Sequence, residues 1–130
     1  MGAQGAPVVV VADDDPSLRF LCRVNLELEG YRVEEATESR ELLELAETGD
    51  VALVLLDLHL GSENGIDVAR GLRERHPGIP IVLISGSAEL GAPAAAVSDA
   101  VIRKPFQLDE LIGTARRLAR GQAPPPPALP

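Results

Sequence analysis

The feature that most constrains the fold is a fivefold alternation between short apolar runs and amphipathic segments. The runs lie at 8–12, 31–34, 51–56, 81–84 and 100–103. Strands that follow one another through helices form parallel sheets. The most apolar runs are continuous rather than interrupted at every second residue, as in strands covered on both faces. The sequence therefore predicts an α/β fold with a five-stranded parallel sheet and helices on both of its faces.

The first connecting segment carries clear helix signals. Asp15 is placed to cap a helix that begins at Pro16, and Gly30 is a natural stop. The apolar stripe of this helix is predicted from spacing. Its members are Leu18, Leu21, Val24 and Leu28.

The other connecting segments also predict helices, but the one before the fifth apolar run does so only weakly. Helices are predicted over 39–48 and 65–75, with a loop at 57–64 before the second of them. The next segment offers only 89–98, interrupted by Gly91 and Pro93, and predicts a short helix that begins near Pro93. The last helix follows Pro105 and ends near Gly121. Its apolar positions are Leu108, Leu111, Ile112, Ala115 and Leu118.

A chain of 130 residues is expected to form one domain. We assign the domain to 8–121, a short N-terminal extension to 1–7, and a tail or linker to 122–130, where five residues are prolines. No apolar run approaches the ~20 residues of a membrane-spanning helix, and the first residues do not resemble a signal peptide. A single cysteine, Cys22, cannot form an internal disulfide. These features predict a cytoplasmic protein without a membrane partner.

The charge balance argues against several classes of partner. Twenty acidic residues against 12 basic ones give a net charge of −8, and such a surface repels nucleic acids and anionic lipids. Aromatic residues make up only 2% of the chain, so stacking on bases is not expected. Lys104 is the only lysine.

Polar side chains follow four of the five apolar runs. Asp13 and Asp14 follow the first, Asp57 the third, Ser85 the fourth and Lys104 the fifth. The carboxyl ends of parallel strands form the usual site of an open α/β sheet. Clustered carboxylates repel one another unless a cation intervenes, and an all-oxygen set with open positions suits Mg²⁺.

This group of side chains suits phosphoryl transfer. A carboxylate can attack a phosphoryl group and form an aspartyl phosphate. A metal ion and the lysine would neutralise the transferred charge. A serine hydroxyl that moves to meet the phosphoryl group would provide a two-state element for a switch.

At these positions the chain resembles the receiver domains of two-component response regulators, including the chemotaxis-regulator type. The resemblance covers about 8–121. The matching segments are Val11-Ala12-Asp13-Asp14-Asp15-Pro16, Leu55-Leu56-Asp57-Leu58, Gly65, Ile84-Ser85-Gly86 and Lys104-Pro105-Phe106. The resemblance implies a flavodoxin-like sheet of order 2-1-3-4-5.

The same resemblance implies a role for each residue of the group. Asp57 is the expected phosphoacceptor, with Ser85 as the switch hydroxyl and Lys104 as the phosphate-contacting lysine. Asp13 and Asp14 are expected to hold Mg²⁺ together with Asp57 and the backbone carbonyl of His59. The expected phosphodonor is a histidine kinase or a histidine phosphotransfer protein, and phosphorylation is expected to switch binding of a downstream partner. A weak homodimer is compatible with this reading.

Three departures from the family pattern affect these expectations. Val101 stands where receivers usually carry an aromatic residue, so the usual coupling of that ring to the switch hydroxyl is not expected. Gly61 stands where a proline is frequent and should loosen its loop. The segment between Ser85 and Lys104 is short for the family, and we do not carry over a standard dimerisation mode.

Two alternatives remain open from the sequence. A pseudo-receiver would be a binding scaffold that never accepts phosphate. A phosphohydrolase of the haloacid-dehalogenase type would use Asp13 and Asp15, with Ser85, Lys104 and Asp109 downstream, but Pro16-Ser17 replaces the Gly-Thr usual in that pattern. The favoured reading is a signalling module rather than an enzyme.

Overall fold

A five-stranded parallel sheet forms the centre of the molecule. The computed structural model describes residues 6–86 and 91–120. The strands are β1 (Val8–Ala12), β2 (Arg32–Ala36), β3 (Val51–Asp57), β6 (Ile81–Ser85) and β7 (Ala100–Arg103). They pair in parallel in the order β2-β1-β3-β6-β7. Counted along the chain, these five strands have the order 2-1-3-4-5, which confirms the predicted fold class and strand order.

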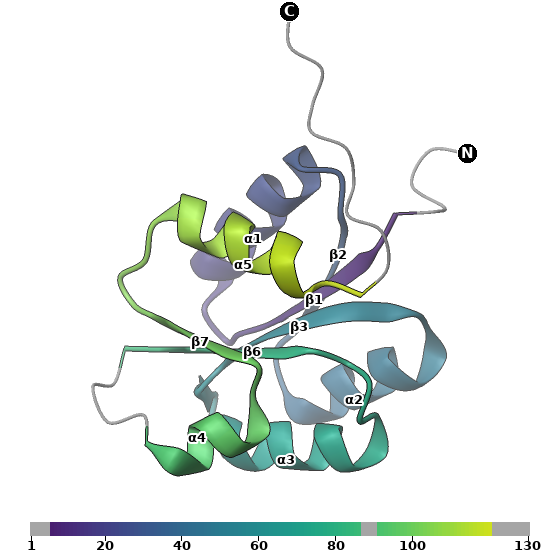
Figure 1. Cartoon of the computed structure of the whole chain (residues 1–130), viewed down its shortest axis with the longest axis vertical. Coiled ribbons are helices and arrows are strands. Elements are labelled where there is room, and N and C mark those ends of the chain that lie inside the picture. Colours follow the sequence, from purple (N-terminus) through teal and green to yellow (C-terminus); the bar gives the residue numbers. More distant parts are fainter. Residues whose placement is uncertain (1–5, 87–90, 121–130) are drawn as a thin grey trace, which may run out of the picture.

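Helices cover both faces of this sheet (Figure 1). One face carries α1 (Pro16–Leu28) and α5 (Leu108–Leu118). The other carries α2 (Ser39–Thr48), α3 (Gly65–Arg75) and α4 (Ala92–Val97). The bounds of α2 and α3 match the prediction, and the six-residue α4 confirms a short fourth helix.

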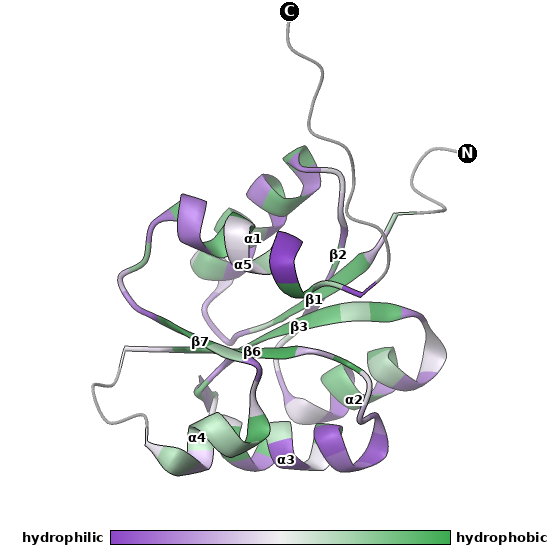
Figure 2. Cartoon of the chain, viewed as in Figure 1, coloured by the Kyte–Doolittle hydropathy of each residue, from purple (hydrophilic) through white to green (hydrophobic). Residues whose placement is uncertain are grey.

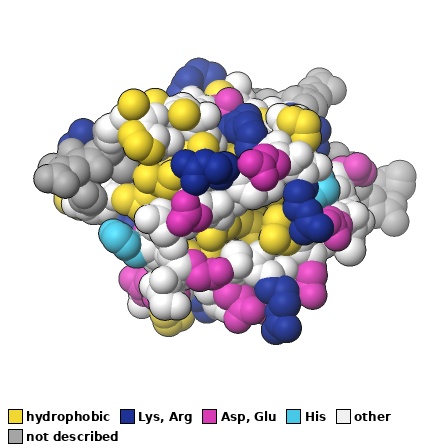
Figure 3. Space-filling view, turned by 90° about the horizontal axis from the view of Figure 1, so that it is seen from below, with side chains coloured by type: hydrophobic (Ala, Val, Ile, Leu, Met, Phe, Trp, Pro, Cys, Tyr) yellow, Lys and Arg dark blue, Asp and Glu magenta, His cyan; other side chains and the backbone are white. Residues whose placement is uncertain are grey.

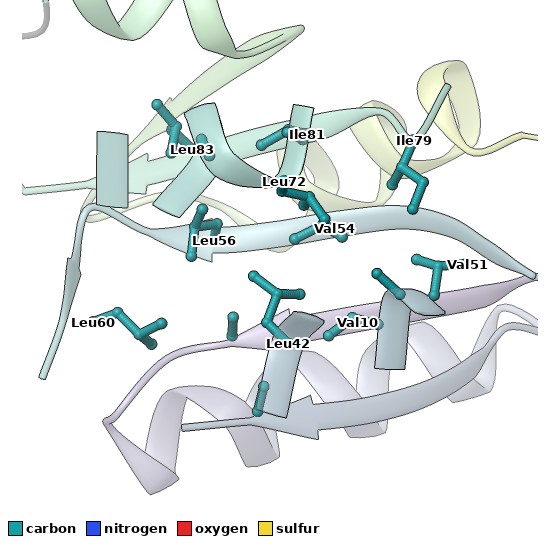
Figure 4. Close-up of a cluster of buried hydrophobic side chains, with 14 of the residues drawn as sticks. Val10, Leu42, Val51, Val54, Leu56, Leu60, Leu72, Ile79, Ile81 and Leu83 are labelled. Carbon is teal, nitrogen blue, oxygen red and sulfur yellow. The ribbon is translucent and has the colours of Figure 1, made fainter. Parts of the chain in front are cut away.

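Two apolar cores lie on opposite faces of the sheet, because successive residues of a strand point in opposite directions. Val10, Val54 and Leu56 pack toward α2, α3 and α4, as Figure 4 shows. Val9 and Leu53 pack toward α1 and α5. All seven residues of β3 are buried, which explains its uninterrupted apolar run. Hydrophobic residues accordingly concentrate in the strands, and hydrophilic residues occur mainly on the helices and loops (Figure 2).

The predicted stripe of α1 was wrong in part. Leu21, Val24 and Leu28 have exposed fractions of 42%, 36% and 68%. The fully buried residues of α1 are instead Cys22 and Leu26. The helix has two neighbouring apolar faces at helical spacing, and only packing against the sheet decides which of them is buried.

The predicted loop at 57–64 was also wrong in part. It contains a small antiparallel hairpin of β4 (His59–Leu60) and β5 (Glu63–Asn64). Gly61 lies in its turn with a φ of 61°. Proline is locked near −65°, so the glycine supplies a turn that proline could not adopt.

Outside the sheet, the surface carries charges of both signs. Acidic and basic side chains are interspersed on the face seen from below the view of Figure 1, where α3 and α4 lie (Figure 3). Within residues 6–86 and 91–120, no helix has the length and apolar character needed to cross a membrane. The predicted tail at 122–130 and residues 1–5 of the predicted N-terminal extension lie outside the described residues.

Candidate functional site

Strand ends bring the predicted site residues to one edge of the sheet. Asp13 directly follows β1, Asp57 ends β3, Ser85 ends β6, and Lys104 follows β7. The backbone N–H of Lys104 donates to the carbonyl of Ser85 at 2.8 Å, so pairing continues past the end of β7. The parallel register therefore places the four side chains at the same end of neighbouring strands.

Three carboxylates form a cluster at this edge. One carboxylate oxygen from each of Asp13, Asp14 and Asp57 lies within 4.8 Å of the others. Asp13 and Asp57 are buried, with exposed fractions of 2% and 6%, whereas Asp14 is exposed. The cluster is therefore open to solvent on the side of Asp14.

Lys104 reaches this acidic cluster from β7. Its Nζ lies 3.3 Å from Oδ2 of Asp57 and 3.7 Å from Oδ2 of Asp13. The side chain of Lys104 is 31% exposed, so its ammonium group is only partly hydrated. One flexible cation thus lies between two buried carboxylates.

The other oxygen of each buried carboxylate is held by a backbone N–H two residues later. Oδ1 of Asp13 accepts from Asp15 at 2.8 Å, and Oδ1 of Asp57 accepts from His59 at 3.1 Å. These bonds fix the rotation of both carboxylates. Both Oδ2 atoms are thereby directed toward Lys104.

Burial and mutual repulsion alter the ionisation of the cluster. The pKa of Asp13 rises from 3.8 to about 6, first because burial removes water from its charged form and further because Asp57 is close. The backbone N–H of Asp15 and the charge of Lys104 act in the opposite direction without cancelling this rise. In the absence of a further cation, a proton therefore competes for this site near neutral pH.

Ser85 and Val101 occupy the neighbouring strand ends. Ser85 is fully buried at the end of β6. Val101 lies on β7, pairs with Leu83 and packs against the core that faces α2, α3 and α4. No ring is present at this position to rotate toward the serine.

The loop after Asp57 passes very close to the start of α3. The backbone N–H of Gly65 donates to the carbonyl of Leu58 at 2.6 Å. A Cβ on Gly65 would lie 2.6 Å from both the carbonyl oxygen of Asp57 and the Cα of Leu58. Glycine is thus required for this approach, which also sets the position of the exposed His59 in β4.

Asp15 and Asp109, which an alternative interpretation assigned to catalysis, lie at helix starts. The carboxylate of Asp15 accepts the backbone N–H of Ser17 at 2.9 Å and caps α1. This confirms the predicted cap and occupies the side chain with a structural hydrogen bond. Asp109 lies in the first turn of α5.

Sequence reasoning missed two side chains that hold the site. Arg19 donates from Nη1 to the backbone carbonyl of Asp13 at 2.8 Å. Glu63, in the hairpin after Asp57, accepts the backbone N–H of Ser39 at 2.8 Å and also its hydroxyl. The Glu63–Ser39 contact joins residues 24 positions apart, and the Arg19–Asp13 contact spans six residues from α1 back to the residue after β1, so neither follows a standard helix or capping spacing.

A protein-family comparison identifies this arrangement. The model of the response regulator receiver domain matches residues 9–116. The chain belongs to the response regulator receiver family. Among curated relatives of this receiver domain, a response regulator MprA of Mycolicibacterium vanbaalenii is 32% identical over 119 residues, covering 89% of this chain and 52% of the relative. The cell cycle transcriptional regulator CtrA of Caulobacter vibrioides is 33% identical over 115 residues, covering 86% and 50%. The receiver chain thus spans about half the length of these relatives.

Solved structures support the same assignment. A CheY-like receiver domain protein of Methanospirillum hungatei has a TM-score of 0.80 and 26% identity, covering 87% of this chain and 93% of that one. The response regulator TrrA of Thermotoga maritima, solved in complex with Mg²⁺ and BeF, has a TM-score of 0.77 and 28% identity. That likeness covers 86% of this receiver domain and 98% of TrrA.

Proposed function

We propose that this receiver domain accepts a phosphoryl group on Asp57 from a phosphohistidine and that the reaction depends on Mg²⁺. The observation that carries the proposal is the geometry around Asp57. Its buried carboxylate faces a lysine ammonium at 3.3 Å and belongs to a three-carboxylate cluster. A nucleophile, a neutralising cation and an acidic cluster suited to a metal thus lie close together.

The donor set fits a hard divalent cation. The side-chain ligand atoms of the cluster are all carboxylate oxygens, and the exposed Asp14 leaves one side open to solvent. Mg²⁺ favours such oxygen ligands, few of them from protein, with several waters. The raised pKa of Asp13 is a second argument, because burial and the nearby Asp57 make its charged form costly, and a bound cation would offset that cost. Asp13, Asp14 and Asp57 would hold the ion, together with the backbone carbonyl of His59. When bound, it would offset the negative charge of the incoming phosphoryl group.

The chain's own residues have distinct parts in the transfer. A carboxylate oxygen of Asp57 attacks the phosphorus of the phosphohistidine. The P–N bond breaks, its electron pair stays with the imidazole, and the ring leaves neutral with its other nitrogen protonated. Lys104 stabilises the phosphoryl oxygens, and the hydroxyl of Ser85 donates a hydrogen bond to one of them.

We assign the docking of the phosphodonor to the exposed apolar face of α1. The donor must bring its phosphorus to the carboxylate of Asp57, so it has to cover the surface around this edge of the sheet. α1 begins three residues after Asp13, and Phe20 and Leu21 in its first half are 66% and 42% exposed. Apolar side chains beside a polar site are typical of a protein-binding surface. The occupant we propose is the phosphodonor, a histidine kinase or a histidine phosphotransfer protein.

The activity of the whole protein depends on what the receiver domain regulates. Curated relatives such as CtrA, of which this chain matches about half, are transcriptional regulators by name. We propose by this likeness that phosphorylation of Asp57 changes a surface that a downstream partner binds. The net charge of −8 argues that the receiver domain itself does not contact DNA.

Intact-protein mass tests the proposal directly. The wild-type chain and Asp57→Asn are incubated with a small acyl phosphate, with Mg²⁺ or with a chelator. We expect one added phosphoryl group in the wild type with Mg²⁺, and none in the other three samples. If no adduct forms, beryllofluoride is added and the melting temperature is measured. A Mg²⁺-dependent rise would indicate a phosphoryl group that hydrolyses too fast to detect, and no rise would support a scaffold that never accepts phosphate.

A further inference from the structure

One arginine joins the acidic cluster to the neighbouring strand β2. Nη1 of Arg19 donates to the backbone carbonyl of Asp13 at 2.8 Å, and its Nε donates to Oε1 of Glu35 at 2.8 Å. The side chain of Arg19 is only 17% exposed. Both donors belong to one rigid planar guanidinium, so Glu35 on β2 sets where the donor to Asp13 lies.

The backbone carbonyl of Asp13 affects the orientation of two side chains of the acidic cluster. It belongs to the peptide unit between Asp13 and Asp14, which is planar and includes the Cα atoms of both residues. Rotation of this unit would redirect both side chains at once. The other contacts of Asp13 are the N–H of its own backbone with the carbonyl of Ala36 at 3.0 Å, its Oδ1 with Asp15, and its Oδ2 with Nζ of Lys104 at 3.7 Å. None of these holds the peptide unit that leads to Asp14.

The chain contains a natural comparison for Arg19. Arg23, one turn later in α1, donates from Nε to the other oxygen of Glu35 at 2.6 Å. It also pairs with Glu27 at 3.0 Å, and its side chain is 34% exposed. Arg23 therefore ties α1 to β2 through the same carboxylate as Arg19, but its hydrogen bonds go to Glu35 and Glu27 and not to Asp13.

We infer that Arg19 is a positioning residue that orients Asp13 and Asp14 for binding a divalent cation, with Glu35 as its anchor. The inference rests on the proposed function, in which these two carboxylates hold the ion. An ion pair that only fastened α1 to β2 would be served equally by Arg23. The hydrogen bond to the peptide between the two metal-binding aspartates distinguishes Arg19 from it.

The test compares Arg19→Gln with Arg23→Gln in the absence of any phosphodonor. The chain has no tryptophan, so metal binding is followed by the electron paramagnetic resonance signal of free Mn²⁺ and by displacement of Mn²⁺ with Mg²⁺. Buffer is kept alkaline enough to ionise the carboxylates. Substitutions of groups that orient metal ligands weaken binding by about 10–100-fold, and we expect about tenfold for Arg19→Gln. Each variant loses one ion pair with Glu35, and Arg23→Gln also loses an exposed pair with Glu27 that contributes little to stability, so their unfolding midpoints in chelator should fall by similar amounts.

The control variant and the wild type define the outcomes. Arg23→Gln should bind Mn²⁺ within about twofold of the wild type, since it leaves the bond to Asp13 in place. Equal affinities in the two variants would overturn the inference and leave Arg19 a structural ion pair. If the wild type itself binds no Mn²⁺, the proposed function fails instead.

A second variant covers the case in which Arg19→Gln does not fold. Arg19→Lys keeps the positive charge, but a single ammonium group cannot occupy the positions of both Nε and Nη1. We expect it to fold and still to bind Mn²⁺ more weakly than Arg23→Lys. Wild-type affinity in Arg19→Lys would show that the two-point contact is not what orients the aspartates.

Discussion

Glu63 caps the first turn of α2 from outside that helix. Its carboxylate accepts the backbone N–H of Ser39 at 2.8 Å and the Ser39 hydroxyl as well. Glu38 occupies the N-cap position of α2 but makes no capping hydrogen bond with its side chain. The hairpin that follows Asp57 therefore supplies the cap, and the position of α2 is tied to the loop of the candidate site.

This contact predicts an unequal effect of two glutamate substitutions. Glu63→Ala leaves a helix donor without its acceptor and should lower the free energy of unfolding by about 1 kcal/mol, as loss of a helix cap does. Glu38→Ala is the control, because it removes only an exposed pair with Arg40 at 3.4 Å and should change stability little. Urea denaturation measures both. Equal losses would mean that Glu63 does not act as the cap.

Gly65 predicts a steric effect within α3. In Gly65→Ala the new Cβ would lie 2.6 Å from backbone atoms of Asp57 and Leu58, so the loop after Asp57 must move. We expect a loss of about 1–3 kcal/mol, in the range of overpacked sites, and weaker Mn²⁺ binding. Gly71→Ala in the same helix meets no atom within 4 Å, and helix propensity should stabilise it by up to about 1 kcal/mol. Urea denaturation measures the stability of both variants. A Gly65→Ala protein as stable as Gly71→Ala would contradict the close contact between Gly65 and the loop after Asp57.

The raised pKa of Asp13 predicts how stability depends on pH in chelator. A carboxyl whose pKa is higher in the folded state than in the unfolded one holds its proton more tightly when folded. The stability that this proton contributes is fully present below pH 3.8 and is lost as the pH rises through about 6. An asparagine cannot ionise, so Asp13→Asn should stabilise the metal-free protein at neutral pH by about 1–2 kcal/mol. A change of one unit in pKa corresponds to about 1.36 kcal/mol, and screening by solvent reduces the full effect. The gain should disappear in acid.

Denaturant unfolding at several pH values, always with chelator, tests this prediction. Asp14→Asn is the control, because the exposed side chain of Asp14 should affect stability less. A gain for Asp13→Asn that is the same at all pH values would show that ionisation of Asp13 is not its source. Saturating Mg²⁺ should reverse the order of stability, because Asp13→Asn loses a ligand of the ion.

The docking face on α1 predicts a difference between large and small phosphodonors. Phe20→Ala should slow phosphotransfer from a histidine kinase or phosphotransfer protein at least about tenfold, as truncation of a central contact residue does. Its phosphorylation by a small acyl phosphate should be unchanged. Leu28→Ala removes an equally exposed side chain, 68% against 66%, at the other end of α1, about 12 Å further along the helix. Rates from radiolabelled transfer compare the two variants, and equal slowing would place the docking surface elsewhere.

The sequence determined those features that depend on local pattern. Continuous apolar runs predicted the five central strands, and the polar residues that follow them predicted the candidate site, because parallel strands end at one edge of a sheet. Asp15 as the cap of α1 depends only on residues up to Ser17, so it too was predictable. The short α4 followed from Gly91 and Pro93.

Only the tertiary structure decided which surfaces and side chains meet across long stretches of chain. α1 has two apolar faces, and packing against the sheet buries Cys22 and Leu26 rather than Leu21 and Leu28. The contacts of Arg19 with Glu35 and of Glu63 with Ser39 join residues 16 and 24 positions apart. Periodicity reports the environment of a residue averaged over a few turns, whereas such contacts depend on how whole elements pack. Hence the residues of the acidic cluster could be predicted from sequence, and the side chains that hold it in place could not.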